Sequence, residues 1–149
     1  IFDSWFHGNK QNISIRTFEE IIEYSVGGTG SLETLGLAPV NLIVISPSGN
    51  YESVDTLKSV KPGAHILGMD VSNHSIDDVL SHPKINFRQI GIKALSQTCK
   101  NCNLVETCGG GYLPHRYSNH NEFDNPSIYC EDLKVLINHI HNSTAQIIG

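Results

Sequence analysis

Four cysteines constrain this chain more than any other feature of its sequence. Three of them follow the spacing Cys99-x2-Cys102-x5-Cys108, and Cys130 comes 22 positions after Cys108, beside an apolar helical pattern. A cubane iron-sulfur cluster needs one sulfur ligand for each iron. This spacing suits such a cluster, with three ligands from one folded loop and the fourth from a distant element. The cysteines therefore predict a 4Fe-4S centre.

Zinc and disulfide bonds are the two alternatives that stay open for the four cysteines. Tetrahedral zinc also takes four thiolates, but its usual signature is two close pairs, and here a long gap separates Cys108 from Cys130. Zinc also substitutes for iron at soft thiolates in protein prepared in air. Two disulfides remain possible as well, although the chain is long enough to build a core and shows no signal peptide.

Length and charge limit the classes of function. The 149 residues are 39% hydrophobic, which predicts a soluble single domain with its own core and no membrane-spanning stretch. The net charge is -5 and the basic residues are scattered, so we expect no nucleic-acid partner. An oxygen-sensitive cluster favours a cytoplasmic location. Because the chain begins at Ile1 without an initiator Met, we expect a fragment or processed piece of a longer protein.

The first half of the chain predicts a helix followed by a hairpin. Apolar residues at helical spacing over residues 15–26 indicate an amphipathic helix that ends at Gly27-Gly28. Residues 40–45 are typical of a strand, residues 47–50 of a turn, and residues 51–54 of the partner strand.

The second half predicts short helices and one long one. Ser75 resembles the cap of a short helix that runs through Leu80. A further short helix over residues 87–95 leads into the cysteine loop. The last helix is expected to be capped by Asn125, with Pro126 at its first position, and to carry Cys130 on its apolar stripe.

Between Cys108 and Cys130 the sequence has a glycine-rich loop. Three consecutive glycines, residues 109–111, allow the backbone to pass close to a cofactor and to direct N–H groups at sulfur. His115 and Arg116 follow, and two roles are open for them: contact with a peptide substrate, or hydrogen bonds to the cluster. An ordinary solvated loop is the simpler alternative.

These residues carry a resemblance to a known family. The spacing Cys99-x2-Cys102-x5-Cys108-Gly-Gly-Gly, then Arg116-Tyr117, then the run from Phe123 through Cys130 to Leu133 resemble the SPASM domain, the C-terminal auxiliary-cluster domain of radical SAM enzymes. Residues 108–118 are especially similar to the branch that cross-links side chains in ribosomally made peptides, including cyclophane-forming maturases. The resemblance is strong from Cys99 to about Ile140.

The resemblance implies an α+β fold, with a β-hairpin and short helices around one four-cysteine site. It assigns residues 40–149 to the SPASM-like domain and leaves residues 1–39 as a helical linker region packed on it. Cys99, Cys102, Cys108 and Cys130 match the ligands of the outer auxiliary 4Fe-4S cluster. A cluster with four cysteine ligands leaves no iron open to substrate, which points to electron transfer and support of substrate binding.

Two departures from the family pattern define what is missing. Many SPASM domains have a further cysteine where this chain has Tyr112, and residues 40–63 contain none, so the first auxiliary cluster is absent. The chain also lacks Cys-x3-Cys-x2-Cys, the motif that binds SAM and cleaves it. We therefore expect no SAM cleavage by this chain alone. The partners expected are a radical SAM barrel, normally in the same polypeptide, and a precursor peptide.

Two functions of other classes stay open beside this one. The first is a non-enzymatic binding module with a structural four-cysteine zinc site. The second is a domain that recognises a leader peptide, with the metal serving only the fold.

Overall fold

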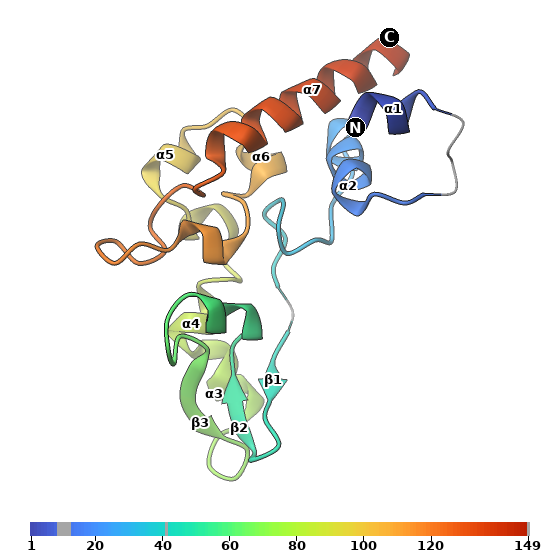
Figure 1. Ribbon diagram of the computed structural model, residues 1–149. Helices are drawn as coiled ribbons and strands as arrows, with labels where there is room; N and C mark the ends of the chain where they lie inside the picture. Colours follow the sequence, from blue (N-terminus) through green and yellow to red (C-terminus); the bar gives the residue numbers. More distant parts are fainter. Residues whose placement is uncertain (9–12, 41, 149) are drawn as a thin grey trace.

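Residues 1–8, 13–40 and 42–148 are described by a computed structural model of the chain. They form an α+β structure with a three-stranded antiparallel sheet at one end and a group of helices at the other (Figure 1). The longest helix, α7 (Cys130–Ile148), runs along the top of the helical end. The α+β class predicted from the sequence is confirmed. Among the helices in these residues, none has both the length and the apolar character needed to cross a membrane.

The sheet contains the predicted hairpin in shortened form. Strand β1 (Val44–Ile45) pairs with β2 (Asn50–Glu52), with Val44 opposite Glu52 and Ile45 opposite Tyr51. The prediction of a strand over residues 40–45 was too long, and Asn41 within it lies outside the described residues. The predicted partner strand over residues 51–54 begins one residue earlier and ends two residues sooner.

A third strand, β3 (Ile66–Asp70), pairs with β2 and was not predicted. Its pattern is weak because Gly68 interrupts it with a φ of +74°, in the left-handed region that glycine adopts without strain. The pairing is also irregular, with a register shift between Tyr51 and Glu52. A bulged strand loses the strict alternation that identifies strands in a sequence.

Short helices continue the chain beyond the sheet. The 3-10 helix η1 (Asp55–Ser59) follows β2, and α3 (Ile76–Ser81) and α4 (Pro83–Asn86) follow β3. The predicted cap of α3 is confirmed, because the hydroxyl of Ser75 accepts a hydrogen bond from the backbone N–H of Asp78 and the Asp78 carboxylate accepts one from that of Ser75. A small core joins α3 and α4 to the sheet: Tyr51, Leu67, Val79 and Ile85.

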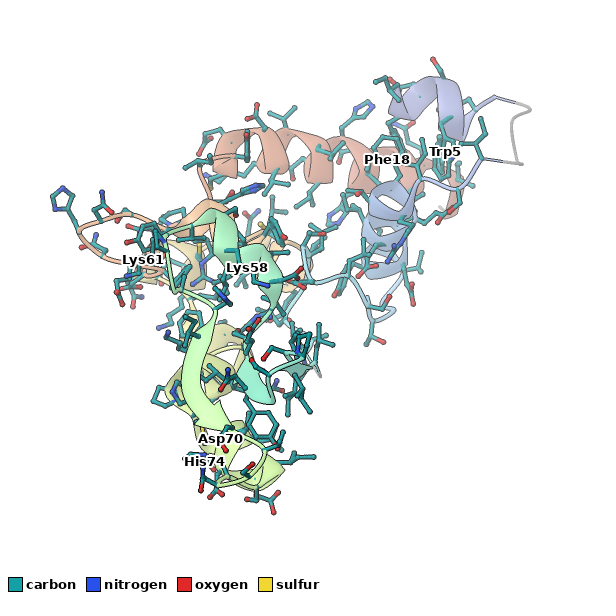
Figure 2. The ribbon with its side chains drawn as sticks, turned by 60° about the horizontal axis from the view of Figure 1, so that its bottom comes forward. Trp5, Phe18, Lys58, Lys61, Asp70 and His74 are labelled. Carbon is teal, nitrogen blue, oxygen red and sulfur yellow. The ribbon has the colours of Figure 1, made fainter. Side chains whose placement is uncertain are left out.

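The predicted helix over residues 15–26 is confirmed as α2 (Arg16–Ser25), which packs against α7. A shorter helix, α1 (Phe2–Phe6), was not predicted and lies close to α2 and to the C-terminal half of α7 (Figure 1). Figure 2 shows Trp5 of α1 beside Phe18 of α2, and their ring centroids are 5.6 Å apart. His139 of α7 lies 2.6 Å from the Asp3 carboxylate, which ties α1 to the last helix.

The main core lies between α2, α7 and residues 97–108, which we call the cysteine segment. Its buried members are Phe2, Ile21, Leu35, Leu104, Ile137 and Ile140. The side chains of Cys102 and Cys108 pack against this core. The cysteine segment is therefore part of the packed interior.

We expect Ile140→Ala to lower the free energy of unfolding by about 2–5 kcal/mol, the usual cost of removing a fully buried Ile side chain. Ile140 has no exposed surface and belongs to α7, the helix that packs against α2. Urea unfolding monitored by circular dichroism measures the change. The control is Val135→Ala on the same helix, because Val135 is 71% exposed and its loss should change stability by less than about 0.5 kcal/mol. Equal losses in both variants would contradict this packing.

Two helix predictions in the second half were wrong. Residues 87–95 do not form one helix, because Gly91 has a φ of +54°, and only the 3-10 helix η2 (Gly91–Ala94) lies there. The last helix begins at Cys130 and not next to Asn125. The Asn125 amide instead donates to the backbone carbonyls of Arg116 and Glu122 and to the Ser118 hydroxyl. These contacts fix the loop over residues 116–125. The sequence pattern alone did not indicate this role for Asn125.

Candidate metal centre

The first three cysteines lie on two short helices and on the tight turn that joins them. Cys99 is in α5 (Gln97–Lys100), where its backbone N–H donates to the Ser96 hydroxyl at 3.5 Å. The N–H of Cys102 donates to the carbonyl of Cys99 at 3.0 Å. Cys108 ends α6 (Val105–Cys108). Local backbone hydrogen bonds therefore set the spacing of these three side chains.

Cys130 reaches the same region from the other direction, as the first residue of α7. The segment before it turns at Ser127, whose carbonyl accepts from the Cys130 N–H at 3.0 Å and whose hydroxyl accepts from the Tyr129 N–H at 3.1 Å. One turn further along α7, Lys134 lies beside the same region and forms an ion pair with Glu131 at 2.8 Å.

All four cysteines line a single cavity of about 530 Å³, which we call the cysteine cavity. Gly110, Ser127, Lys134 and Ile137 are also part of its wall. All four thiols are free of disulfide bonds. Within the described part of the chain, no three His, Cys, Asp or Glu side chains converge closely enough to hold a metal ion. The thiols thus surround a space and do not meet at one point.

Burial favours the neutral thiol at two of these positions. Loss of solvent raises the pKa of Cys108 above its usual value, and a hydrogen bond from the backbone N–H of Gly110 acts in the opposite direction. Loss of solvent also raises the pKa of Cys130, which the positive charge of Lys134 opposes.

The glycine run turns the chain sharply after Cys108. Gly109, Gly110 and Gly111 have φ values of +59°, +81° and +72°, a succession that residues with a Cβ rarely adopt. Gly109 is the left-handed residue that ends α6. The run thereby places Gly110 in the wall of the cysteine cavity.

The backbone at Gly36, far away in the sequence, packs directly against this turn. The backbone N–H of Gly36 donates to the carbonyl of Thr107 at 2.9 Å. A Cβ added to Gly109 would overlap the carbonyl oxygen of Gly36, so the two backbones are in direct contact. Sequence reasoning missed this contact, and only the glycines at positions 36 and 109 hinted that two backbones approach so closely.

His115 and Arg116 lie in the 3-10 helix η3 (Leu113–Arg116), in different surroundings. His115 is half-buried, and its ring packs edge-on against Tyr112 and Tyr129, with centroids 5.1 Å and 4.9 Å away. Arg116 is only 5% exposed, and its guanidinium donates to backbone carbonyls inside the domain. Peptide contact by these two residues stays a prediction.

The residues present fit an iron-sulfur cluster. The donor set is four free thiols, and soft thiolates are the ligands that such clusters take. The cavity between them has a volume of about 530 Å³, and its wall includes the apolar side chain of Ile137. The groups that would hold a cluster are therefore Cys99, Cys102, Cys108 and Cys130.

The fold is that of a part of known radical SAM enzymes. The structure of native anSMEcpe with bound AdoMet matches with a TM-score of 0.71 and 18% identity, over 98% of this chain and 38% of that one. Two structures of the same enzyme that also hold a peptide match with TM-scores of 0.70 (Kp18Cys peptide, 18% identity, 98% and 39% coverage) and 0.65 (Cp18Cys peptide, 19% identity, 98% and 40% coverage).

The chain thus spans about two fifths of the length of these structures. They belong to an anaerobic sulfatase-maturating enzyme, a radical SAM enzyme with a SPASM domain. The SPASM-like fold expected from the sequence is therefore confirmed. These matches are not to enzymes of the cyclophane branch, so they give that finer assignment no support. No protein-family model and no curated protein sequence matches the chain.

Proposed function

We propose that this chain is the part of a radical SAM peptide-modifying enzyme that binds an auxiliary 4Fe-4S cluster. The observation that carries the proposal is the cysteine cavity, in which four free thiols from separate elements face one space in a SPASM-like fold. When bound, a cluster with four cysteine ligands supplies one-electron transfer.

The chain's own residues supply the support for such a cofactor. The segment from α5 to α6 presents three thiols at fixed spacing, and α7 adds the fourth to the cavity wall. Cys102 and Cys108 pack against the main core, which limits the access of water to that side of the cavity. Exclusion of water and hydrogen bonds to sulfur both influence the potential of a cluster.

The partners in this proposal lie outside the 149 residues. SAM cleavage belongs to a radical SAM barrel with its own cysteine motif, which this sequence lacks. The substrate is a ribosomally made peptide, in keeping with the peptides held in two of the similar structures. The similarity of residues 108–118 to cross-linking maturases makes side-chain cross-linking the reaction we favour. We place the peptide at the packed rings of Tyr112, His115 and Tyr129, the last of which precedes Cys130 in the chain.

We also propose that residues 40–149 form the cluster-binding domain and that residues 1–39 act as its support. Two contacts favour this division: α2 packs on α7, and the N–H of Gly36 bonds to Thr107 next to Cys108. The first region would then stabilise the cysteine segment without contributing a ligand.

Anaerobic reconstitution with iron and sulfide tests the proposed cofactor. We expect about four irons and about four sulfides per chain, with a broad sulfur-to-iron absorption band that bleaches on reduction. The measurements are iron, sulfide and zinc content of protein purified without oxygen from iron-replete cells. One zinc per chain and no sulfide would overturn the proposal and favour the alternative, a binding module with a structural zinc site.

Calorimetry against candidate precursor peptides tests the substrate separately. Binding that is equal with and without the barrel, in protein that never assembles a cluster, would favour the leader-peptide alternative. Binding that requires the barrel supports the enzyme.

A further inference from the structure

Arg116 connects the two segments that present the cysteines. Its Nη2 donates to the carbonyl of Ala94 at 2.8 Å, just before α5, and to that of Phe123 at 2.9 Å. Its Nε donates to the carbonyl of Asn125 at 3.3 Å, in the loop before α7. The guanidinium also lies over the ring of Phe87, 5.5 Å from its centroid. One buried side chain therefore joins the approach to Cys99 with the approach to Cys130.

The loop before α7 also donates hydrogen bonds to the backbone of His115 and Arg116. The amide of Asn125 donates to the backbone carbonyl of Arg116 at 2.9 Å, and the N–H of Ile128 donates to the carbonyl of His115 at 2.9 Å. Backbone and side chain of Arg116 are thus both bonded to the same loop. Such reciprocal hydrogen bonds fix the loop more firmly than either bond alone.

The positive charge of Arg116 lies directly behind the glycine turn of the cysteine cavity. A Cβ added to Gly110, a residue of the cavity wall, would lie 3.6 Å from Nη1 and 3.7 Å from Cδ of Arg116. Loss of solvent lowers the pKa of Arg116, and negative charge at Cys99, Asp124 or Cys108 acts in the opposite direction. Arginine stays protonated in proteins, so the site behind the turn carries a permanent positive charge. At 5% exposure, solvent screens that charge little.

We propose that Arg116 is a positioning residue for the cluster, and that its buried charge raises the reduction potential of that cluster. The inference rests on the proposed function, because it requires a 4Fe-4S cluster in the cysteine cavity. Reduction adds one electron, and hence one negative charge, to the cluster. A fixed cation nearby stabilises the reduced form more than the oxidised form.

The test is a redox titration of the reconstituted chain with dithionite as the electron donor, followed by electron paramagnetic resonance. We expect R116Q to keep its iron and to shift the midpoint potential to a more negative value. R116K keeps the charge but loses the forked donor geometry, so we expect a potential near that of the wild type and a lower melting temperature. A residue that served only the fold would move the melting temperature alone.

The matched control is Arg88→Gln. Arg88 is also buried, with its side chain 7% exposed, but its guanidinium pairs with Glu33 at 2.8 Å, whereas that of Arg116 lies against Gly110 of the cavity wall. R88Q should lower stability and leave the potential unchanged. An unchanged potential in R116Q, or an equal shift in R88Q, overturns the inference. Where R116Q does not fold, a negative shift in R116K overturns it and a wild-type potential supports it.

The outcome also separates this inference from the proposed function. A wild-type chain that assembles no cluster defeats the proposed function. A wild-type chain that assembles one, with a potential insensitive to Arg116, defeats only the inference.

Discussion

We expect Cys130→Ala to prevent assembly of the proposed four-iron cluster while leaving the metal-free chain folded. Cys130 is the one cysteine on α7, and the other three lie on or between α5 and α6. Without it, one iron has no protein sulfur, and full cysteine ligation is lost. The iron content after anaerobic reconstitution should fall from about four to about one or fewer per chain, and the absorption band should disappear. Cys102→Ala should have the same effect.

Two controls accompany this experiment: a second substitution on α7, and the circular dichroism of the metal-free variant. Val135→Ala changes an exposed side chain five positions further along α7, and it should keep the full iron content. Circular dichroism of the metal-free Cys130→Ala chain should match that of the wild type, because Cys130 is only half-buried. A Cys130→Ala chain with unchanged iron and sulfide would contradict the role of Cys130 as a required ligand.

Gly109→Ala should be the most damaging substitution that leaves every cysteine in place. Its φ of +59° costs a residue with a Cβ about 1–2 kcal/mol. The new Cβ would also overlap the carbonyl oxygen of Gly36, so the backbone at Gly36 or the glycine turn must move. We expect a loss of unfolding free energy well beyond the φ cost, and weaker iron retention because Cys108 is the preceding residue.

Gly27→Ala separates the cost of the left-handed φ from the cost of the overlap with Gly36. Gly27 has a φ of +82°, but a Cβ there would meet nothing within 4 Å. It should therefore lose only about 1–2 kcal/mol in urea unfolding and keep its iron content. If the two alanine variants lost the same stability, the contact between Gly109 and Gly36 would not exist in solution.

The sequence was sufficient where a local pattern dictates structure. The apolar spacing over residues 15–26 predicted α2, and Ser75 with Asp78 predicted the start of α3, because a helix and its cap depend on neighbours within a few positions. It failed over residues 87–95, where a left-handed Gly91 divides an apparently helical pattern. It also failed at β3, whose stability comes from pairing with β2.

For the candidate site, the sequence alone determined which residues are proposed as donors, the tight spacing of Cys99, Cys102 and Cys108, and the sharp turn that follows them. Backbone geometry within a few residues fixes these features. Only the tertiary structure decided that Gly36 packs against the turn and that Arg116 bonds to the backbone before α5 and before α7. It also showed that Cys130, expected on the apolar stripe of its helix, lines the same cavity as the other three cysteines. The reason is physical: the apolar spacing of a helix shows which face is buried but not which distant segment packs against that face.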